Sequence, residues 1–191
     1  MQASGFVLAG GGSTRMGRNK ALLPFHGITL VEHIARIVRE AAGSVTLIGD
    51  PAQLGHLGLP VVPDTLPGCG PASGIYTALT MTSTDWNLIA GCDMPAITRD
   101  ILAGLLRRAA VTPVAIDCIV AAGPDGDAEP LCAAYHRRCL PVVARAIRDN
   151  RLKMKNLLVE FSTEMLSVDA SALANVNTPA EWAEFEAKLL T

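Results

Sequence analysis

Short aliphatic runs alternate with amphipathic segments along this chain, and this alternation restricts its fold more than any other feature. The run "GFVLAG" at 5–10 ends in glycine, and "ITLVEHIARIVREAAG" at 28–43 has helical apolar spacing with Gly43 as a stop. Further strands are predicted at 44–50, 59–64, 85–95, 114–122 and 130–136, and further helices at 71–83, 98–110, 137–149 and after Thr178. The pattern between 150 and 174 specifies no definite element. We therefore predict an α/β fold, with three αβα layers around a mostly parallel, Rossmann-like sheet.

Chain length and composition agree with this fold class. The 191 residues are enough to bury a core on both faces of a sheet, so we expect a single domain over residues 1–191 with one active site. Apolar residues make up 50% of the chain and aromatic residues only 4%, as expected when aliphatic helices cover an aliphatic sheet. An all-β sandwich is therefore disfavoured.

The net charge, the cysteine spacing and the N-terminal sequence together disfavour several kinds of ligand, metal site and cellular location. The net charge of −2 gives no broad attraction for nucleic acid or an anionic membrane, so a bound anion needs a local basic cluster. The five cysteines have no C-x-x-C pair and no zinc-type spacing, which is typical of reduced structural thiols. The N-terminus has neither the pattern of a signal peptide nor a membrane span. We expect a soluble cytoplasmic protein that binds neither nucleic acid nor membrane.

The segment "LAGGGSTRMGRNK" at 8–20 is the strongest candidate for a phosphate site. It is not a Walker loop, because Arg18 stands where lysine must follow the second glycine, and not a dinucleotide fingerprint, because Arg15 replaces the third glycine. A glycine turn brings backbone N–H groups close to a phosphate, and Arg15 and Lys20 supply positive charge. A solvated surface turn with unrelated charges is the alternative. In a parallel sheet the loops after residues 8, 48, 62 and 90 gather at one edge, where ligands bind.

Two aspartates follow predicted strands and are candidates for the same edge. Asp93, in "GCDMP", offers the carboxylate oxygen that Mg²⁺ prefers, the other ligands being supplied by substrate phosphates. Asp64, in "VVPDTLPG", is a second candidate for nucleotide binding. Each is equally compatible with a turn-forming role beside proline.

Six motifs in order resemble one family. "LAGGGSTRMGRNK" is similar to the signature L-A-G-G-x-S-x-R-M-G-x-D-K of the nucleotidyltransferases that build pterin dinucleotides, above all the MobA-type molybdenum cofactor guanylyltransferases. The segments "VVPD", "GPASGIYTAL", "NLIAGCDMPAI", "EPLCAAYHR" and "NVNTPAEW" resemble the family's later blocks, and together they cover nearly the whole chain. The resemblance implies a sheet of the nucleotide-diphospho-sugar transferase type.

The resemblance also implies a reaction and its participants. GMP is transferred from GTP to the phosphate of molybdopterin or its molybdenum-loaded form, with pyrophosphate released and Mg²⁺ as cofactor. The N-terminal part then binds the nucleotide and the C-terminal part binds the acceptor. Transient contact with molybdopterin-donating and target molybdoenzymes or chaperones is implied as well.

Site residues carry over by motif. The catalytic residues are Arg15, Lys20 and Asp93, with Asp93 as the Mg²⁺ ligand. The nucleotide-binding residues are Leu8, Ala9, Gly10, Gly11, Lys20, Gly49, Asp64, Gly70, Pro71, Gly74 and Asp93. The acceptor-binding residues are Glu129, Pro130, Asn175 and Asn177. Helix capping by the two asparagines and close packing of the small residues at 70–74 remain as alternatives.

The sequence departs from the family pattern at three places. Asn19 stands where the family has Asp, "LIGD" lacks the asparagine found after the second strand, and Ala72 and Ser73 replace Leu and Ala in the base-pocket block. The four histidines have no metal spacing, and Cys92 is expected to be buried rather than nucleophilic. The "LAGG" form and the "GPASG" block favour GTP over CTP. A cytidylyltransferase, another pyrophosphorylase, and a non-catalytic nucleotide sensor or pterin carrier are the alternatives.

Overall fold

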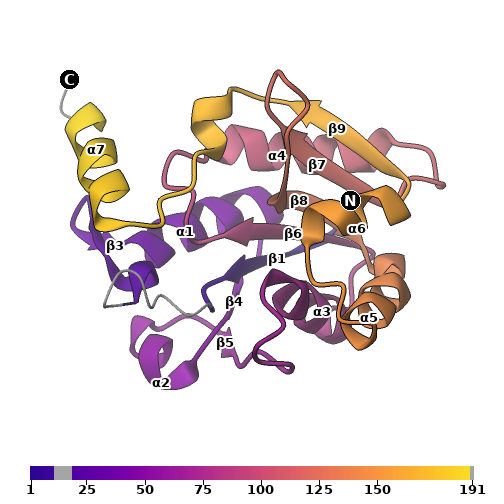
Figure 1. Cartoon of the computed structure of the whole chain (residues 1–191), viewed down its shortest axis with the longest axis horizontal. Coiled ribbons are helices and arrows are strands. Elements are labelled where there is room, and N and C mark those ends of the chain that lie inside the picture. Colours follow the sequence, from indigo (N-terminus) through magenta and orange to yellow (C-terminus); the bar gives the residue numbers. More distant parts are fainter. Residues whose placement is uncertain (11–18, 190–191) are drawn as a thin grey trace.

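A seven-stranded sheet forms the centre of the molecule (Figure 1). The computed structural model describes residues 1–10 and 19–189, the last two by their backbone alone. Strand order is β5-β4-β1-β6-β8-β7-β9, and β8 is antiparallel to both of its neighbours while the other pairs are parallel. The strands are β1 (Ala3–Leu8), β4 (Thr46–Ile48), β5 (Val61–Val62), β6 (Trp86–Gly91), β7 (Cys118–Ala122), β8 (Ala128–His136) and β9 (Thr163–Ser167). The prediction of a mostly parallel sheet is confirmed.

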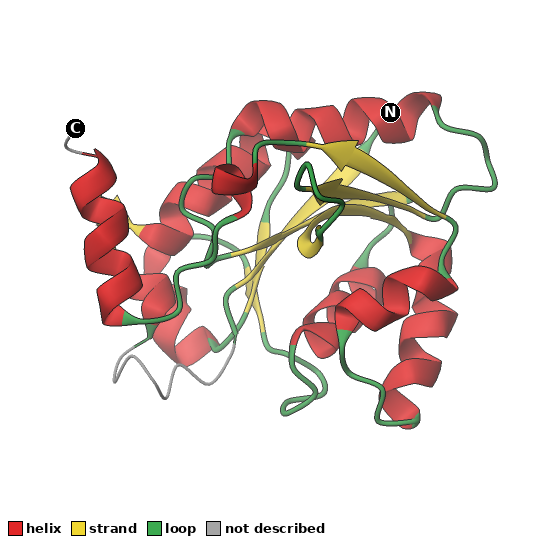
Figure 2. Ribbon diagram, turned by 45° about the horizontal axis from the view of Figure 1, so that its top comes forward, coloured by secondary structure: helices red, strands yellow, loops and turns green. Residues whose placement is uncertain are grey.

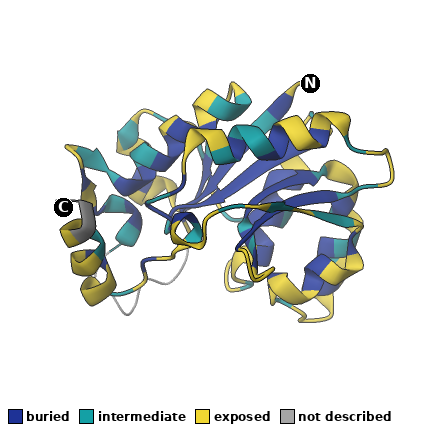
Figure 3. Cartoon of the chain, turned by 90° about the horizontal axis from the view of Figure 1, so that it is seen from above, coloured by how far each residue is buried: buried dark blue, intermediate teal, exposed yellow. Residues whose placement is uncertain are grey.

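Helices cover both faces of this sheet (Figure 2). One face carries α1 (Leu30–Ala42) and α4 (Arg99–Val111), and the other carries α3 (Pro71–Met81), α5 (Leu140–Arg148) and α6 (Met154–Leu157). Alternation along β1 divides its side chains between the two layers, because Val7 packs with α1 while Phe6 and Leu8 pack with α3. Figure 3 shows the buried strands between the two helical layers.

The first crossover shows how local sequence sets the element boundaries. Helix α1 begins at a capping box, in which the Thr29 hydroxyl accepts from the Glu32 N–H and the Glu32 carboxylate accepts from the Thr29 N–H. It ends at Gly43, whose φ of 82° favours glycine. Gly5 on β1 is required as well, since a Cβ there would lie 2.4 Å from the Ser44 carbonyl oxygen.

Short elements complete the edge near β5. A hairpin of β2 (Pro24–Phe25) and β3 (Ile28–Thr29) follows the turn η1 (Lys20–Leu22), and α2 (Pro51–Leu54) with η2 (Gly55–Leu57) joins β4 to β5. The last helix, α7 (Pro179–Leu189), packs on this hairpin, with the Trp182 ring 6.0 Å from that of Phe25. Its start is capped as the sequence predicts, by the Thr178 hydroxyl and the Glu181 carboxylate.

Several segments differ from the sequence prediction. The β2–β3 hairpin and α2 with η2 had no predicted counterpart, and the helix predicted at 28–43 begins only at Leu30 because Ile28 and Thr29 form β3. The strand predicted at 114–122 begins only at Cys118, because Pro113 starts a turn closed by the Ile116 N–H. The helix predicted at 137–149 is divided into η3 (Arg137–Cys139) and α5, with Pro141 in the first turn of α5. The segment without a prediction contains α6, η4 (Leu158–Glu160), β9 and η5 (Ala170–Leu173). Among the described residues, no helix has the length and apolar character needed to cross a bilayer.

Candidate active site

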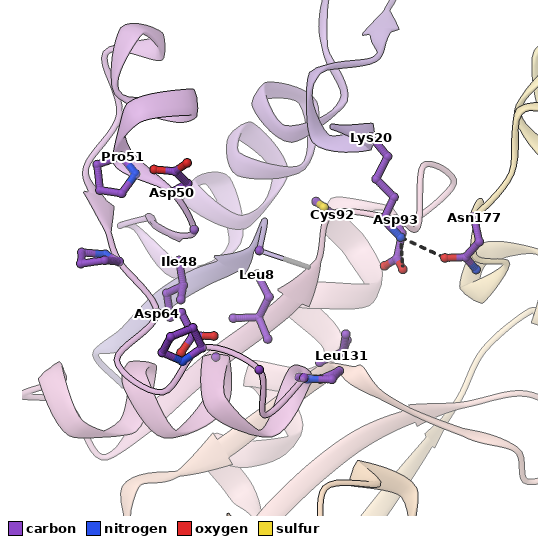
Figure 4. Close-up of a pocket in the computed structure, with 18 residues that line it drawn as sticks. Leu8, Lys20, Ile48, Asp50, Pro51, Asp64, Cys92, Asp93, Leu131 and Asn177 are labelled. Atoms are coloured by element: carbon purple, nitrogen blue, oxygen red, sulfur yellow. Dashed lines mark hydrogen bonds and ion pairs between the residues drawn. The ribbon is translucent and has the colours of Figure 1, made fainter. Parts of the chain in front are cut away.

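A cavity of about 790 Å³ lies at the carboxyl ends of β1, β4, β5 and β6 (Figure 4). All four loops predicted to meet at this edge contribute to it, which confirms that expectation. The side chains of Leu8 and Ile48 lie between the β4 side, with Asp50, and the β6 side, with Asp93. Its lining residues are Leu8, Gly10, Lys20, Ile48, Gly49, Asp50, Pro51, Pro63, Asp64, Pro67, Gly68, Gly70, Pro71, Gly74, Cys92, Asp93, Leu131 and Asn177.

The Lys20 ammonium connects three distant parts of the chain at the β6 side of the cavity. Lys20 Nζ lies 2.8 Å from Asp93 Oδ2 and donates to Asn177 Oδ1 at 2.9 Å. The Lys20 and Asp93 side chains are 20% and 18% exposed, so the ion pair remains accessible from the cavity. An ammonium has three donors, and two of them are used by partners within the described ranges. Lys20 can therefore direct its third N–H at an anion in the cavity.

Backbone geometry at the end of β6 fixes Asp93 in this position. The Cys92 N–H donates to the Leu8 carbonyl at 3.2 Å, which continues the β1–β6 pairing past the strand end. A Cβ at Gly91 would lie 2.7 Å from Asp93 Oδ1, so glycine is needed where the carboxylate folds back. The Asp93 carbonyl accepts from the Val176 N–H at 2.8 Å. This bond holds the C-terminal segment, and with it Asn177, against the cavity.

Asp64 lies in the cavity wall and is also heavily hydrogen-bonded. Its Oδ1 accepts from the Ser73 hydroxyl, from the Leu66 N–H at 3.1 Å and from the Thr77 hydroxyl at 3.5 Å. Thr77 also bonds the Thr65 hydroxyl at 2.8 Å. The turn-forming role considered for Asp64 is therefore present, and within the described part of the chain Oδ2 has no hydrogen-bond partner and remains for a ligand. Ser73, one of the departures from the family pattern, therefore joins Asp64 to α3 together with Thr77.

Small residues shape the wall formed by α3. Gly70 precedes the helix with a φ of 60°, a conformation that side chains rarely adopt. A Cβ at Gly74 would lie 2.9 Å from Leu8 Cδ1, so glycine lets α3 approach β1. Gly70, Pro71 and Gly74, the predicted nucleotide-binding residues of this block, all line the cavity, and the close packing considered as the alternative is present at Gly74.

The four residues predicted to contact an acceptor are only partly brought together. The Asn175 amide donates to the Glu129 carboxylate at 3.2 Å, and Asn177 lines the cavity. Pro130 is buried, and its carbonyl accepts from the Tyr135 hydroxyl at 3.0 Å. Leu131 reaches the cavity from the same strand. Glu129 and Asn175 therefore form a polar pair next to the cavity, whereas Pro130 contributes to the core.

The cavity wall also contains residues that the sequence did not predict, and not every predicted residue reaches it. Gly10 and Gly49 line the cavity, whereas Ala9 is buried and donates its N–H to the Ile48 carbonyl at 2.9 Å. Gly11 and Arg15 lie outside the described residues. Sequence reasoning missed the lining residues Ile48, Asp50, Pro51, Pro63, Pro67, Gly68, Cys92 and Leu131. For Asp50, Pro51, Pro63 and Cys92 the available signal was their position within three residues after a strand end, whereas Leu131 lies inside β8 and had no such signal.

The titratable groups near Asp93 favour charge neutralisation over nucleophilic catalysis. Burial and the neighbouring Asp93 carboxylate raise the pKa of the Cys92 thiol to about 12, so Cys92 is a thiol at neutral pH. Among the described residues, no cluster of three or more His, Cys, Asp and Glu side chains that could hold a metal is found. Asp93 lines the cavity, and its Oδ1 receives no hydrogen bond from the described residues, so this oxygen remains available as a metal ligand.

Comparisons with known proteins place the chain in a family. The model of the MobA-like NTP transferase domain matches residues 5–163. The chain is 34% identical over 185 residues to a probable molybdenum cofactor guanylyltransferase of Carboxydothermus hydrogenoformans, covering 92% of this chain and 91% of the relative. It is 31% identical over 183 residues to one of Flavobacterium johnsoniae, covering 92% of each chain.

Solved structures show the same fold at lower sequence identity. Molybdopterin-guanine dinucleotide biosynthesis protein A from Archaeoglobus fulgidus superposes with a TM-score of 0.80 at 22% identity, covering 97% of this chain and 98% of that one. A CMP:2-keto-3-deoxy-manno-octonic acid synthetase superposes with a TM-score of 0.76 at 15% identity, covering 100% and 99%. The fold is therefore that of the nucleotide-diphospho-sugar transferases. With a family model over most of its length and relatives above 30% identity, the chain belongs to the MobA-like NTP transferase family and is a nucleotidyltransferase.

Proposed function

We propose that this protein transfers GMP from GTP to the terminal phosphate of molybdopterin, or of its molybdenum-loaded form, and releases pyrophosphate. One observation carries the proposal: the Lys20 ammonium is bonded to Asp93 at the nucleotide cavity and to Asn177 of the C-terminal segment. A group transfer between two phosphates needs cations where donor and acceptor meet. The names of the relatives, probable molybdenum cofactor guanylyltransferases, support a guanylyl donor and an acceptor of the molybdenum cofactor type.

The chemistry requires positioning and charge neutralisation. An oxygen of the acceptor phosphate attacks the α-phosphorus of the nucleotide, a new P–O bond forms, and the bond to the β-phosphate breaks with its electron pair going to pyrophosphate. The nucleophile is an anion at neutral pH, so no general base is required. Lys20, together with Arg15, neutralises charge on the α-phosphate and the departing pyrophosphate.

Mg²⁺ is part of the proposal, and the residues present fit it. Mg²⁺ commonly binds one or two protein carboxylates and takes its remaining ligands from phosphate and water. Asp93 offers Oδ1 beside the cavity, and the Lys20 contact occupies Oδ2. Bound there with the nucleotide, Mg²⁺ would neutralise phosphate charge. Asp93 is thus the proposed metal ligand, and nucleotide phosphates supply the others.

The two halves of the site are proposed to divide the substrates. A cavity of about 790 Å³ is within the range for a nucleotide-sized ligand. Its α3 wall, with Gly70, Pro71 and Gly74, is the proposed base side, and the free Oδ2 of Asp64 suits a ribose hydroxyl or a base N–H. The Glu129–Asn175 pair and Asn177 are proposed to contact the pterin. A cytoplasmic location and transient handover to molybdoenzymes or their chaperones belong to the same proposal.

Nucleotide binding tests the proposal directly. The purified protein is titrated by calorimetry with GTP, CTP, ATP and UTP in Mg²⁺, and then with GTP in the absence of Mg²⁺. We expect selective, Mg²⁺-dependent binding of GTP that Asp93→Ala weakens strongly. Asp100→Ala is the control, because Asp100 is an exposed aspartate on α4 and does not line the cavity.

The other outcomes are equally informative. Preference for CTP would reassign the reaction to cytidylyl transfer. GTP binding without turnover of molybdopterin would favour a sensor or carrier. Absence of binding by every nucleotide would contradict the proposal altogether.

A further inference from the structure

A chain of side-chain hydrogen bonds connects the residue before Lys20 to the opposite side of the cavity. Asn19 Nδ2 donates to Gln53 Oε1 at 2.8 Å, and Gln53 Nε2 donates to Asp50 Oδ2 at 3.0 Å. Both ends are anchored to backbone: Asn19 Oδ1 accepts from the Ala21 N–H at 3.0 Å, and Asp50 Oδ1 accepts from the Ala52 N–H at 2.9 Å. These four bonds form what we call the Asn19–Gln53–Asp50 relay.

The direction of every bond in the relay follows from the chemistry of its ends. The Asp50 carboxylate only accepts, so the amide nitrogen of Gln53 must face it. This leaves the Gln53 oxygen toward Asn19, which must then donate. The Asn19 oxygen is free to accept the Ala21 N–H, as it does. An aspartate at position 19 would place two acceptors opposite each other, and turning the Gln53 amide would only move that conflict to Asp50.

The relay lies between two parts of the cavity wall that carry site residues. Asn19 is the N-cap of the three-residue turn η1, whose first residue is Lys20. Asp50 is the N-cap of α2, which follows β4 directly. Asp50 and Pro51 line the cavity on the β4 side, and Lys20 lines it on the β6 side (Figure 4). Because η1 is so short, contacts of its cap strongly influence where the Lys20 side chain starts.

We propose that Gln53 is a positioning residue, which through Asn19 and Asp50 sets the place of Lys20 relative to the β4 side of the nucleotide cavity. The consequence for nucleotide binding rests on the proposed function, whereas the hydrogen-bond polarity does not. The relay also explains the departure at Asn19, since Asp50 makes asparagine, rather than aspartate, the matching residue at that position.

The test is to reverse the direction of the hydrogen bonds in the relay by exchanging the residue types at its two ends. In the double variant Asn19→Asp with Asp50→Asn, Gln53 donates to the carboxylate now at position 19 and accepts from the amide now at position 50, so all bonds are regained with unchanged net charge. Each single variant is expected to weaken Mg²⁺-dependent GTP binding about five- to tenfold, the worth of one net hydrogen bond. The double variant is expected to return to within about twofold of the unmodified protein, which is strong coupling in the double-mutant cycle.

Two rival explanations predict different GTP affinities for the variants of this double-mutant cycle. If only charge near the phosphates matters, Asp50→Asn alone binds GTP as tightly as the unmodified protein or more tightly. If Asp50 contacts the nucleotide itself, the double variant is weakened by the product of the two single effects. Either result would contradict the positioning role proposed for Gln53. Gln53→Met, which keeps the length but removes both bonds, should show the single-variant loss and abolish the coupling.

A second measurement is independent of any nucleotide. Amide hydrogen exchange at Ala21 and Ala52 reports the two anchors, and it should accelerate in the single variants and return in the double variant. Unchanged exchange rates at Ala21 and Ala52 in the single variants would contradict the role proposed for the relay, even if no nucleotide bound. If the exchange rates show the expected coupling between positions 19 and 50 but GTP does not bind, only the proposed function is contradicted. Gln2→Glu, a matched charge change beyond the other end of β1, is the control.

Discussion

Lys20 and Asp93 are 73 residues apart in the sequence, and Lys20 and Asn177 are 157 apart. The three side chains nevertheless meet within hydrogen-bonding distance at one edge of the sheet. A cation in this position balances the Asp93 carboxylate and retains a donor that can be directed at a phosphate. At the scale of single residues, the site therefore depends on one ammonium with several partners.

Removing that ammonium should impair turnover much more than stability. For Lys20→Ala we expect a fall in kcat of about 10²- to 10³-fold, the usual loss when a group that stabilises transition-state charge is deleted. The ion pair is part-exposed, so the thermal midpoint should change little. Activity assays and thermal melts check both statements. Arg108→Ala, which breaks the Arg108–Glu164 pair between α4 and β9, is the control. Unchanged turnover in folded Lys20→Ala protein would contradict the role given to Lys20.

Gly74 offers a test of cavity shape rather than charge. The added methyl of Gly74→Ala would lie 2.9 Å from Leu8 Cδ1 and push Leu8 toward the cavity, which both residues line. We expect the Kd for GTP to rise at least about fivefold, while the gain in helix propensity, about 0.5–1 kcal/mol, offsets most of the packing strain. Calorimetry and thermal melts measure the two effects. Gly104→Ala on α4 is the control, and equal GTP affinity in both variants would contradict the prediction.

At the scale of elements, most boundaries follow from local capping chemistry. The capping box of α1 and the Gly43 stop match the sequence pattern, and so does the Thr178 start of α7. Asn177 directly precedes the Thr178 cap of α7, and Lys20 directly follows Asn19, the N-cap of η1. Element ends therefore have a double role, because they stop the helices and also place the site residues.

The α1 capping box predicts a pH dependence of stability. Hydrogen bonds from the Thr29 hydroxyl and backbone N–H lower the pKa of Glu32. A lowered folded-state pKa means that the stabilisation is complete above the ordinary carboxyl pKa, about 4.3, and is lost as pH falls through the lowered value. Glu32→Gln should therefore lower the free energy of unfolding by about 0.5 kcal/mol at pH 7. This difference should shrink steadily below about pH 4.

Urea denaturation of both proteins between pH 7 and pH 3 measures this difference. Glu40→Gln, at an exposed position near the other end of α1, should show no comparable loss at pH 7. A Glu32→Gln difference that stays constant down to pH 3 would show that the carboxylate charge does not contribute.

At the scale of the whole molecule, two apolar layers enclose the sheet and bury most of its thiols. Burial raises the pKa of Cys92 and Cys139 to about 12 and raises those of Cys118 and Cys132 as well. Cys69, in the loop before α3, is only half-buried. Thiol reactivity should therefore distinguish local accessibility from unfolding of the core.

Labelling with a disulfide reagent at pH 8 tests this expectation. In the native protein Cys69 should react rapidly, and the other four thiols should react only as the protein unfolds; all five should react in denaturant. Cys69→Ser should remove the rapid phase. Two or more rapidly reacting thiols in the native protein would contradict the packing described for the core.

Local pattern alone was sufficient to predict much of this molecule. The periodicity of apolar residues determined the α/β class and most helices and strands, because a 3.6-residue or two-residue repeat reports directly which face is buried. Strand ends followed by polar loops determined the edge at which the site lies. Asp93 and Lys20 were found from these signals and from the motifs around them.

Tertiary structure decided which residues become partners. The edge strand β9 has no strong local pattern, and its position follows from the free side of β7. The Glu129–Asn175 pair, the meeting of Lys20 with Asn177, and the relay through Gln53 could not be predicted, because each joins segments that only the tertiary structure brings together. The bonds from Ser73 and Thr77 to Asp64 are closer in sequence, but they depend on how α3 packs against β1. Local sequence fixes backbone conformation through short-range sterics and hydrogen bonds, whereas contacts across the chain depend on how the complete sheet and its helices pack.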